Sequence, residues 1–150
     1  MSSEEEMAEF GVALADRFEP GDVVYLRGDL GVGKTTLARS IIRALGFEGR
    51  VKSPSYGLIE TYSGDKMAIA HLDLYRLGHP AEVRDLGVEA YQEAAALLLI
   101  EWPERGLGYI PKANWLITIR DWPSSEEETD ALASLREVTL SRLGVDPAPQ

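Results

Sequence analysis

The segment at residues 28–36 constrains this chain more than any other part of its sequence. It reads Gly-Asp-Leu-Gly-Val-Gly-Lys-Thr-Thr, a full match to the pattern G-x-x-x-x-G-K-[ST]. Glycines at these positions permit a compact loop whose backbone N–H groups converge on phosphate oxygens. Lys34 is then placed to reach the β- and γ-phosphates, and Thr35 to hold Mg²⁺ through its hydroxyl. The residues expected to contact a bound nucleoside triphosphate are Asp29, Gly31, Val32, Gly33, Lys34, Thr35 and Thr36.

The sequence on either side of this loop supplies the strand and the helix that a phosphate-binding loop requires. Residues 22–27 (DVVYLR) are predicted as a buried strand that ends at Gly28. From Lys34 onward, an apolar stripe with helical spacing predicts a helix that ends at Gly46. Such a helix directs the positive end of its dipole at the bound phosphates.

The remainder of the chain alternates between helical and extended patterns, without an internal repeat or a linker. We therefore expect an α/β fold in which residues 1–150 form a single domain and 143–150 a frayed tail. A first helix is expected from the capping-box pattern at Ser3 until Pro20-Gly21, and short helices at Pro80 and over residues 88–93. The further predicted strands are residues 56–62, 66–75, 97–100, 115–120 and 136–141.

Composition excludes several classes of protein. The absence of cysteine excludes disulfides and thiolate metal sites. The chain has no run of about 20 apolar residues, as a membrane span requires, and its acidic start does not resemble a signal peptide. These features predict a cytoplasmic protein. A formal net charge of −10 disfavours broad contact with a nucleic-acid backbone.

Two carboxylates, one at the end of a predicted strand and one within another, are candidates for binding the metal and orienting water. Glu101 follows the apolar run at residues 94–100, so it lies at the carboxyl end of a buried strand, where open α/β sheets bind ligands. Asp73 lies within another predicted strand. Spacing leaves open which of the two holds Mg²⁺ and which orients the attacking water. With Lys34, they are the predicted catalytic residues.

A further polar segment, Ser53-Pro54-Ser55-Tyr56, follows the predicted helix at the place where P-loop GTPases carry a switch that senses the γ-phosphate. The hydroxyls of Ser53 and Ser55 are candidates for contact with metal or phosphate. The alternative, which the local pattern alone slightly favours, is an ordinary turn that contains proline.

Four segments, in this order and spacing, make the chain resemble the bacterial TsaE family, small P-loop ATPases required to make threonylcarbamoyladenosine in tRNA. These segments are residues 28–36, 51–56 (VKSPSY), 71–77 (HLDLYRL) and 100–104 (IEWPE). The phosphate loop is generic, whereas the third and fourth segments together are specific. Ser55 stands where the family commonly has threonine, a change that keeps the hydroxyl.

The resemblance implies a single P-loop domain with a mixed β-sheet flanked by helices. It also implies ATP hydrolysis in partnership with a TsaB–TsaD complex that carries out the tRNA modification, so that tRNA is reached only indirectly. Thr35 and Glu101 would bind Mg²⁺, and Asp73 and Trp102 would belong to the active region. Ser53, Ser55, His71 and Trp102 form the implied switch region, and Glu5 and Arg136 are implied nucleotide contacts.

Three other functions fit a phosphate loop. A small-molecule kinase usually has an arginine-rich lid, but Arg105 is the only arginine between Arg84 and Arg120. A GTPase would carry an Asn-Lys-x-Asp motif, which the sequence lacks. A nucleotide-dependent binding module, in which hydrolysis is incidental, stays open. No residue stands out as an internal arginine finger, so we expect slow hydrolysis by the isolated chain and stimulation by its partner.

Overall fold

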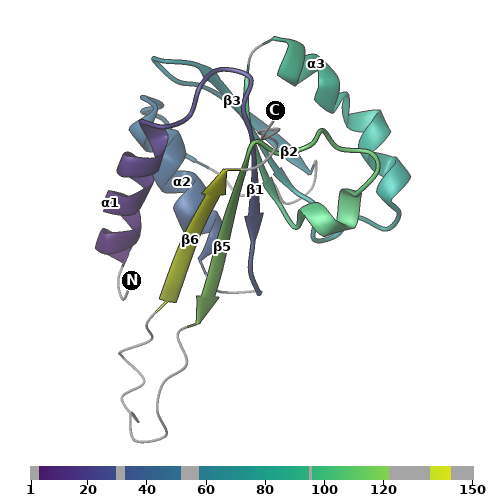
Figure 1. Ribbon diagram of the computed structural model, residues 1–150. Coiled ribbons are helices and arrows are strands. Elements are labelled where there is room, and N and C mark those ends of the chain that lie inside the picture. Colours follow the sequence, from purple (N-terminus) through teal and green to yellow (C-terminus); the bar gives the residue numbers. More distant parts are fainter. Residues whose placement is uncertain (1–3, 30–32, 52–57, 95, 122–135, 143–150) are drawn as a thin grey trace, which may run out of the picture.

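A computed structural model describes residues 4–29, 33–51, 58–94, 96–121 and 136–142 of the chain (Figure 1). The expected tail at residues 143–150 lies outside these ranges. The helices are α1 (Glu4–Ala15), α2 (Lys34–Ala44) and α3 (Val88–Glu93), and the 3₁₀ helices are η1 (Pro80–Leu86) and η2 (Pro103–Gly106). The strands are β1 (Val23–Arg27), β2 (Ile59–Ser63), β3 (Ala68–Asp73), β4 (Leu97–Glu101), β5 (Trp115–Asp121) and β6 (Arg136–Arg142).

The described strands form one sheet in the order β2-β3-β4-β1-β5-β6. Strands β3, β4, β1 and β5 run parallel, and the edge strands β2 and β6 pair antiparallel to their neighbours. The α/β fold and the mixed sheet are therefore confirmed. Because the central strands are parallel, their carboxyl ends meet at one edge of the sheet, which is the lower edge in Figure 1.

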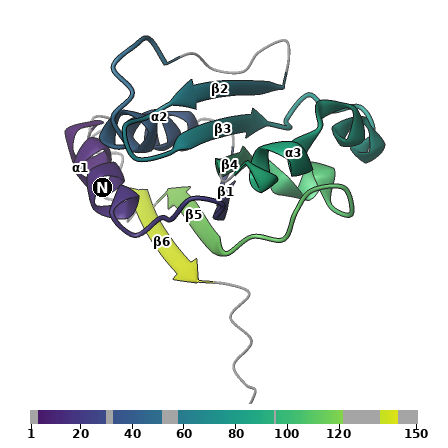
Figure 2. The same ribbon diagram turned by 90° about the horizontal axis from the view of Figure 1, so that it is seen from above.

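Helices cover both faces of the sheet, so the molecule has three layers (Figure 2). On one face α1 and α2 close a core that includes Leu37, Ile41 and Leu99. On the opposite face α3, η1 and η2 cover a second core that includes Leu72 and Leu98. Every residue of β4 is buried, as its apolar sequence predicts. Full burial of one such leucine contributes roughly 1.5–3 kcal/mol.

The chain passes from β1 to α2 through the phosphate-loop segment. Gly33 is the N-cap of α2 with φ 108°, in the left-handed region that glycine tolerates best. The helix ends at Ala44, and Gly46 follows with φ 106°, which confirms the predicted end. The N-terminus of α2 therefore faces the same edge of the sheet as the carboxyl end of β1.

The first helix is shorter than the sequence pattern predicts, since α1 ends at Ala15 and not at Pro20. The backbone N–H of Arg17 donates to the Leu14 carbonyl at 2.9 Å, which tightens the last turn. Phe18 lies beyond this turn and packs edge-on against Trp115, with ring centroids 5.7 Å apart. Packing of Phe18 into the core thus accompanies the early end of the helix.

The predicted strands at residues 56–62 and 66–75 are confirmed as the hairpin β2–β3, in which β2 is described from Ile59 to Ser63 and β3 from Ala68 to Asp73. The turn is closed by a hydrogen bond from the Gly64 N–H to the Met67 carbonyl at 3.0 Å. Strand β3 ends at Asp73, at the same edge of the sheet as Glu101.

In the part of the chain that the structure describes, no helix is long and apolar enough to span a membrane.

Candidate functional site

A cavity opens where β3 and β4 end and α2 begins. The residues that line it come from the first turn of α2, the two strand ends and the segment that follows each strand. They are Gly33, Lys34, Thr35, Thr36, Asp73, Tyr75, Glu101 and Trp102. Strand ends at a reversal of strand order are where open α/β sheets bind ligands. Four of the predicted phosphate-loop residues, Gly33 to Thr36, and both predicted carboxylates therefore share one cavity.

Lys34 is almost entirely buried, with 4% of its surface exposed. Its Nζ donates a hydrogen bond to the Gly28 carbonyl and lies 3.5 Å from the centroid of the Trp102 ring. Burial lowers the pKa of Lys34, and the nearby carboxylates, Glu101 foremost, oppose that shift. The amino group is thus held in the cavity by a carbonyl and an aromatic face.

Thr35 and Glu101 are in direct contact. The Thr35 Oγ1 lies 3.1 Å from Oε1 and 3.2 Å from Oε2 of Glu101, so the hydroxyl donates to the carboxylate. Glu101 is 2% exposed. The prediction that these two residues act together on a metal stays untested, but the structure brings their oxygen atoms to one place.

His71 makes a second contact with the same carboxylate. Its Nε2 lies 2.6 Å from Oε2 of Glu101, and both side chains are buried. His71 does not line the cavity, although Glu101 does. His71 therefore contacts Glu101, the candidate metal ligand, from outside the cavity.

Asp73 is the partner of Glu101 in the parallel register of β3 and β4. Its Oδ1 accepts a hydrogen bond from the Tyr75 N–H at 3.1 Å, which holds the carboxylate at the mouth of the cavity. Burial raises the pKa of Asp73, and the Glu101 carboxylate raises it further. An aspartate in this setting accepts a proton more readily than an exposed one.

Trp102 has a left-handed backbone, with φ 58° and ψ 49°. This conformation is strained for a residue other than glycine, and the following proline disfavours it further. Strain of this kind gathers at functional sites, and here Trp102 directly follows Glu101. The Trp102 indole lies over Lys34, and its ring centroid is 5.0 Å from that of Tyr75.

The sequence-based prediction did not include Tyr75, although it falls within the segment 71–77 that carries the family resemblance. Tyr75 lines the cavity beside Trp102. The guanidinium of Arg105 lies 5.0 Å from the Tyr75 ring centroid and 5.7 Å from that of Trp102. Arg105 therefore stacks on the two rings at the rim of the cavity.

The donor set suits Mg²⁺, because a threonine hydroxyl and carboxylate oxygens are the hard ligands this ion prefers. In the described residues, no group of three or more His, Cys, Asp or Glu side chains forms a self-sufficient metal site. Mg²⁺ at a phosphate site needs only one or two protein ligands, since phosphate oxygens and water complete its shell. Thr35 and Glu101 fit that pattern, with Asp73 beside them.

Other predicted residues lie apart from this cavity or outside the described ranges. Gly31, Val32, Ser53 and Ser55 fall outside the ranges that the structure describes. Asp29 and Glu5 are exposed and do not line the cavity.

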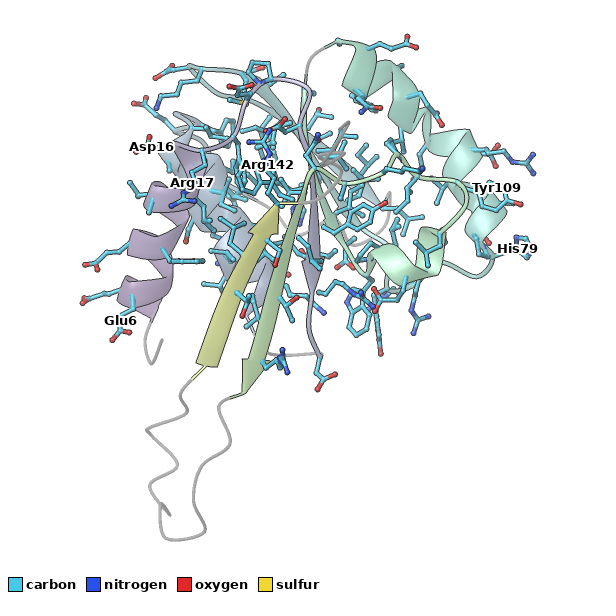
Figure 3. All side chains as sticks on the ribbon, viewed as in Figure 1. Glu6, Asp16, Arg17, His79, Tyr109 and Arg142 are labelled. Carbon is cyan, nitrogen blue, oxygen red and sulfur yellow. The ribbon has the colours of Figure 1, made fainter. Side chains whose placement is uncertain are left out.

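The two implied nucleotide contacts belong to the first turn of α1 and the first residue of β6, elements that begin toward the lower side of Figure 1. Glu5 is in the first turn of α1, whose lower end carries Glu6 in Figure 3. The backbone of Arg136 pairs with Asp121 at the carboxyl end of β5. Arg142 ends β6 at the opposite edge, where it stacks on Trp115 (Figure 3).

The strand order, the start of α2 on a Gly-Lys-Thr turn after β1, and the buried glutamate at the end of β4 define an α/β protein of the P-loop class. Residues 1–130 match the family model of the threonylcarbamoyl adenosine biosynthesis protein TsaE, and the chain belongs to that family. The resemblance noted in the sequence is thereby confirmed.

Relatives carry the same family name. The tRNA threonylcarbamoyladenosine biosynthesis protein TsaE of Haemophilus influenzae is 46% identical over 101 residues, which cover 67% of this chain and 64% of that protein. The TsaE protein of Rickettsia conorii is 42% identical over 69% of this chain and 59% of its own length. The TsaE protein of a Nostoc species is 36% identical over 85% of this chain and 82% of its own length. The match thus spans less than two thirds of the first two relatives.

The fold is shared with a solved structure, that of Bacillus subtilis YdiB. The TM-score is 0.73 at 26% sequence identity, over 96% of this chain and 83% of that one. The likeness extends over nearly the whole chain, in agreement with a single α/β domain.

Proposed function

We propose that the chain binds ATP with Mg²⁺ in the cavity between Lys34 and Glu101 and hydrolyses it to ADP in support of tRNA N6-threonylcarbamoyladenosine biosynthesis. The observation that carries this proposal is the contact between the Thr35 hydroxyl and the buried Glu101 carboxylate. It brings two oxygen ligands of the kind Mg²⁺ prefers to the N-terminus of α2, beside Lys34. The family name supports the pathway, and the loop sequence supports the substrate.

Each side chain has a role in this proposal. Lys34 exchanges the Gly28 carbonyl for phosphate oxygens, and Thr35 and Glu101 hold Mg²⁺, which when bound neutralises charge on the phosphates. Asp73 orients the attacking water and accepts its proton, a role that its raised pKa favours. The proposal thus assigns the metal to Glu101 and the water to Asp73, the choice that sequence spacing left open.

Hydrolysis by the isolated chain is expected to be slow. No arginine is among the residues that line the cavity in the described part of the chain. Arg105, the nearest candidate on this rim, is stacked on Tyr75 and Trp102. In P-loop GTPases, an arginine supplied by a partner protein raises turnover by orders of magnitude. We propose a TsaB–TsaD complex as that partner.

The Glu101→Ala variant tests the site. Turnover should be abolished; retained ATP affinity would assign Glu101 chiefly to hydrolysis, and loss of both would assign it to the metal. Turnover at the wild-type rate would contradict the proposal and favour a binding module with incidental hydrolysis. Release of inorganic phosphate without an added acceptor excludes a small-molecule kinase, and a parallel titration with ATP and GTP separates an ATPase from a GTPase.

The partner is tested by co-purification with TsaB and TsaD, with and without ATP. Capture that depends on ATP, together with faster phosphate release in the complex, is the expected result. Fast turnover by the isolated chain, unchanged by TsaB and TsaD, would contradict the proposed partnership. Steep salt dependence of tRNA binding to the isolated chain would contradict the indirect role of tRNA.

A further inference from the structure

We infer that His71 is a positioning residue, which holds the Glu101 carboxylate in the orientation that the phosphate site requires. This inference deepens the proposed function and rests on it. Its basis is the hydrogen bond of 2.6 Å between His71 Nε2 and Glu101 Oε2, inside the protein, where the two side chains are 1% and 2% exposed. A buried carboxylate is stable only when its oxygens are paired, and His71 supplies one of these partners.

The strand register places His71 behind Glu101. His71 is paired with Leu99 across β3 and β4, whereas Glu101 is paired with Asp73. The hydrogen bond therefore runs diagonally, from one strand to a position two residues further along its neighbour. Because Glu101 and Asp73 line the cavity and His71 does not, the imidazole acts through Glu101 and not on a bound molecule.

The other ring nitrogen of His71 argues for a functional role. Nδ1 is buried and has no hydrogen-bond partner within the described part of the chain. A buried polar atom without a partner costs free energy, and an apolar side chain beside Ile69 and Leu99 would avoid that cost. The contact of Nε2 with Glu101 is thus the interaction that accounts for a histidine at this position.

The hydrogen-bonding role of the His71 ring follows from its partner, the Glu101 carboxylate. Because a carboxylate oxygen accepts hydrogen bonds, Nε2 of His71 is the donor in this contact. Thr35 is the other described donor to Glu101, and the proposed function engages its hydroxyl with Mg²⁺. The hydroxyl can bind Mg²⁺ through its oxygen while it still donates its proton to Glu101, so Thr35 and His71 together fix the carboxylate. A histidine or other partner that orients a metal ligand is a general feature of such sites.

Three variants separate positioning from packing. His71→Leu has similar volume and no donor, and His71→Gln offers an amide donor near the place of Nε2. Ile69→Ala is the matched control, since Ile69 lies on the same face of β3, is 1% exposed and belongs to the core that His71 adjoins. Each is measured for ATP affinity in EDTA, for the Mg²⁺ concentration at half-maximal phosphate release, and for thermal unfolding.

The expected result for His71→Leu is a loss of about tenfold or more in turnover and a similar rise in the Mg²⁺ requirement. ATP affinity in EDTA stays within about twofold, because the backbone amides and Lys34 supply it. His71→Gln recovers most of the loss, and Ile69→Ala lowers the unfolding midpoint without changing the Mg²⁺ requirement. Wild-type Mg²⁺ dependence in His71→Leu, or an equal change in Ile69→Ala, would overturn the inference.

A structural readout keeps this test apart from that of the proposed function. In a crystal structure of nucleotide-free His71→Leu, the Glu101 carboxylate should turn away from Thr35, whereas an unchanged contact would overturn the positioning role. If the wild-type chain binds no ATP, the proposed function fails on that result, and the crystal structure still decides whether His71 orients Glu101.

Discussion

Asp73 and Glu101 are paired with each other in the register of β3 and β4, so two carboxylates lie side by side at the edge of the sheet. The Glu101 carboxylate is hydrogen-bonded to the side chains of Thr35 and His71. Among the described residues, the Asp73 carboxylate accepts a single hydrogen bond, from the backbone N–H of Tyr75. Burial and Glu101 together raise the pKa of Asp73. The site thus holds a charge that the fold disfavours, as expected where function competes with stability.

The first prediction concerns the Asp73→Asn variant. The pKa of Asp73 is raised in the folded chain, which therefore binds this proton more readily than the unfolded chain. The free energy of unfolding consequently falls as the pH rises from about 3.9, the ordinary pKa of an aspartate, through the raised pKa of the folded chain. Asparagine does not ionise, so the Asp73→Asn variant does not lose stability in this way. We therefore expect a higher thermal midpoint for Asp73→Asn than for the wild-type chain at pH 7.

Below about pH 3.9 the advantage should vanish, because Asp73 is then protonated in both states. Asp85→Asn, at an exposed position of η1, is the control. Phosphate release by Asp73→Asn should be at least about tenfold slower, since the proposed water-orienting carboxylate is lost. An unchanged or lower midpoint at pH 7 would show that Asp73 is not disfavoured in the fold.

Lys34→Met tests the phosphate contact. Lys34 is buried, and this burial lowers its pKa because it disfavours the charged form. Removal of the charge should therefore not destabilise the nucleotide-free chain. We expect ATP affinity to fall at least about tenfold, which is ~1.4 kcal/mol. Isothermal titration measures the affinity. Lys66→Met is the matched control, because Lys66 is exposed in a surface pair with Asp16 at 3.6 Å and contributes little. An equal affinity in both variants would exclude Lys34 from the site.

Trp102 should report nucleotide binding. The Lys34 Nζ lies 3.5 Å from the centroid of the indole ring, and in the proposed function Lys34 turns from the ring toward the phosphates of ATP. We expect ATP to change the tryptophan fluorescence of the wild-type chain. Trp102→Phe keeps an aromatic ring over Lys34 but should lose the change. A signal that persists in Trp102→Phe would place the reporter elsewhere and would contradict the movement of Lys34.

Gly11 should be required for the contact between α1 and α2. A Cβ atom on Gly11 would lie 2.5 Å from the Ser40 Cβ and 3.1 Å from its backbone carbonyl carbon. We expect Gly11→Ala to lower the free energy of unfolding by about 1–3 kcal/mol, because α1 must shift away from α2. Val12→Ala is the control, since Val12 is 54% exposed, and its effect should stay within about 0.5 kcal/mol. Urea unfolding of both variants checks the prediction, and equal stabilities would contradict it.

The strand-end position of Glu101 was predictable from the sequence, whereas Asp73 was predicted within a strand and the structure shows that β3 ends there. An apolar run before Glu101 and alternation around Asp73 both identify strands, and parallel strands bring their carboxyl ends together. The contact of Glu101 with Thr35 was harder to predict from the sequence, because it depends on β4 lying next to β1 in the sheet. Local patterns specify each strand but not its neighbours.

Other features of the site have no local sequence signal. The hydrogen bond between His71 and Glu101 joins residues 30 positions apart, so spacing alone does not reveal it. The left-handed backbone of Trp102 runs against the preferences of a residue before proline. The end of α1 at Ala15 likewise depends on the packing of Phe18 against a distant tryptophan. In each case tertiary contacts outweigh the local preference.

The most direct test of the account is the release of inorganic phosphate from ATP by the wild-type chain and by Glu101→Gln, each in Mg²⁺, alone and with TsaB and TsaD. We predict slow release by the isolated wild-type chain, faster release with the partners, and at least about tenfold slower release by Glu101→Gln in both settings, a change of ~1.4 kcal/mol in the barrier. Release by Glu101→Gln at the wild-type rate would contradict the assignment of this cavity as a magnesium-dependent ATPase site.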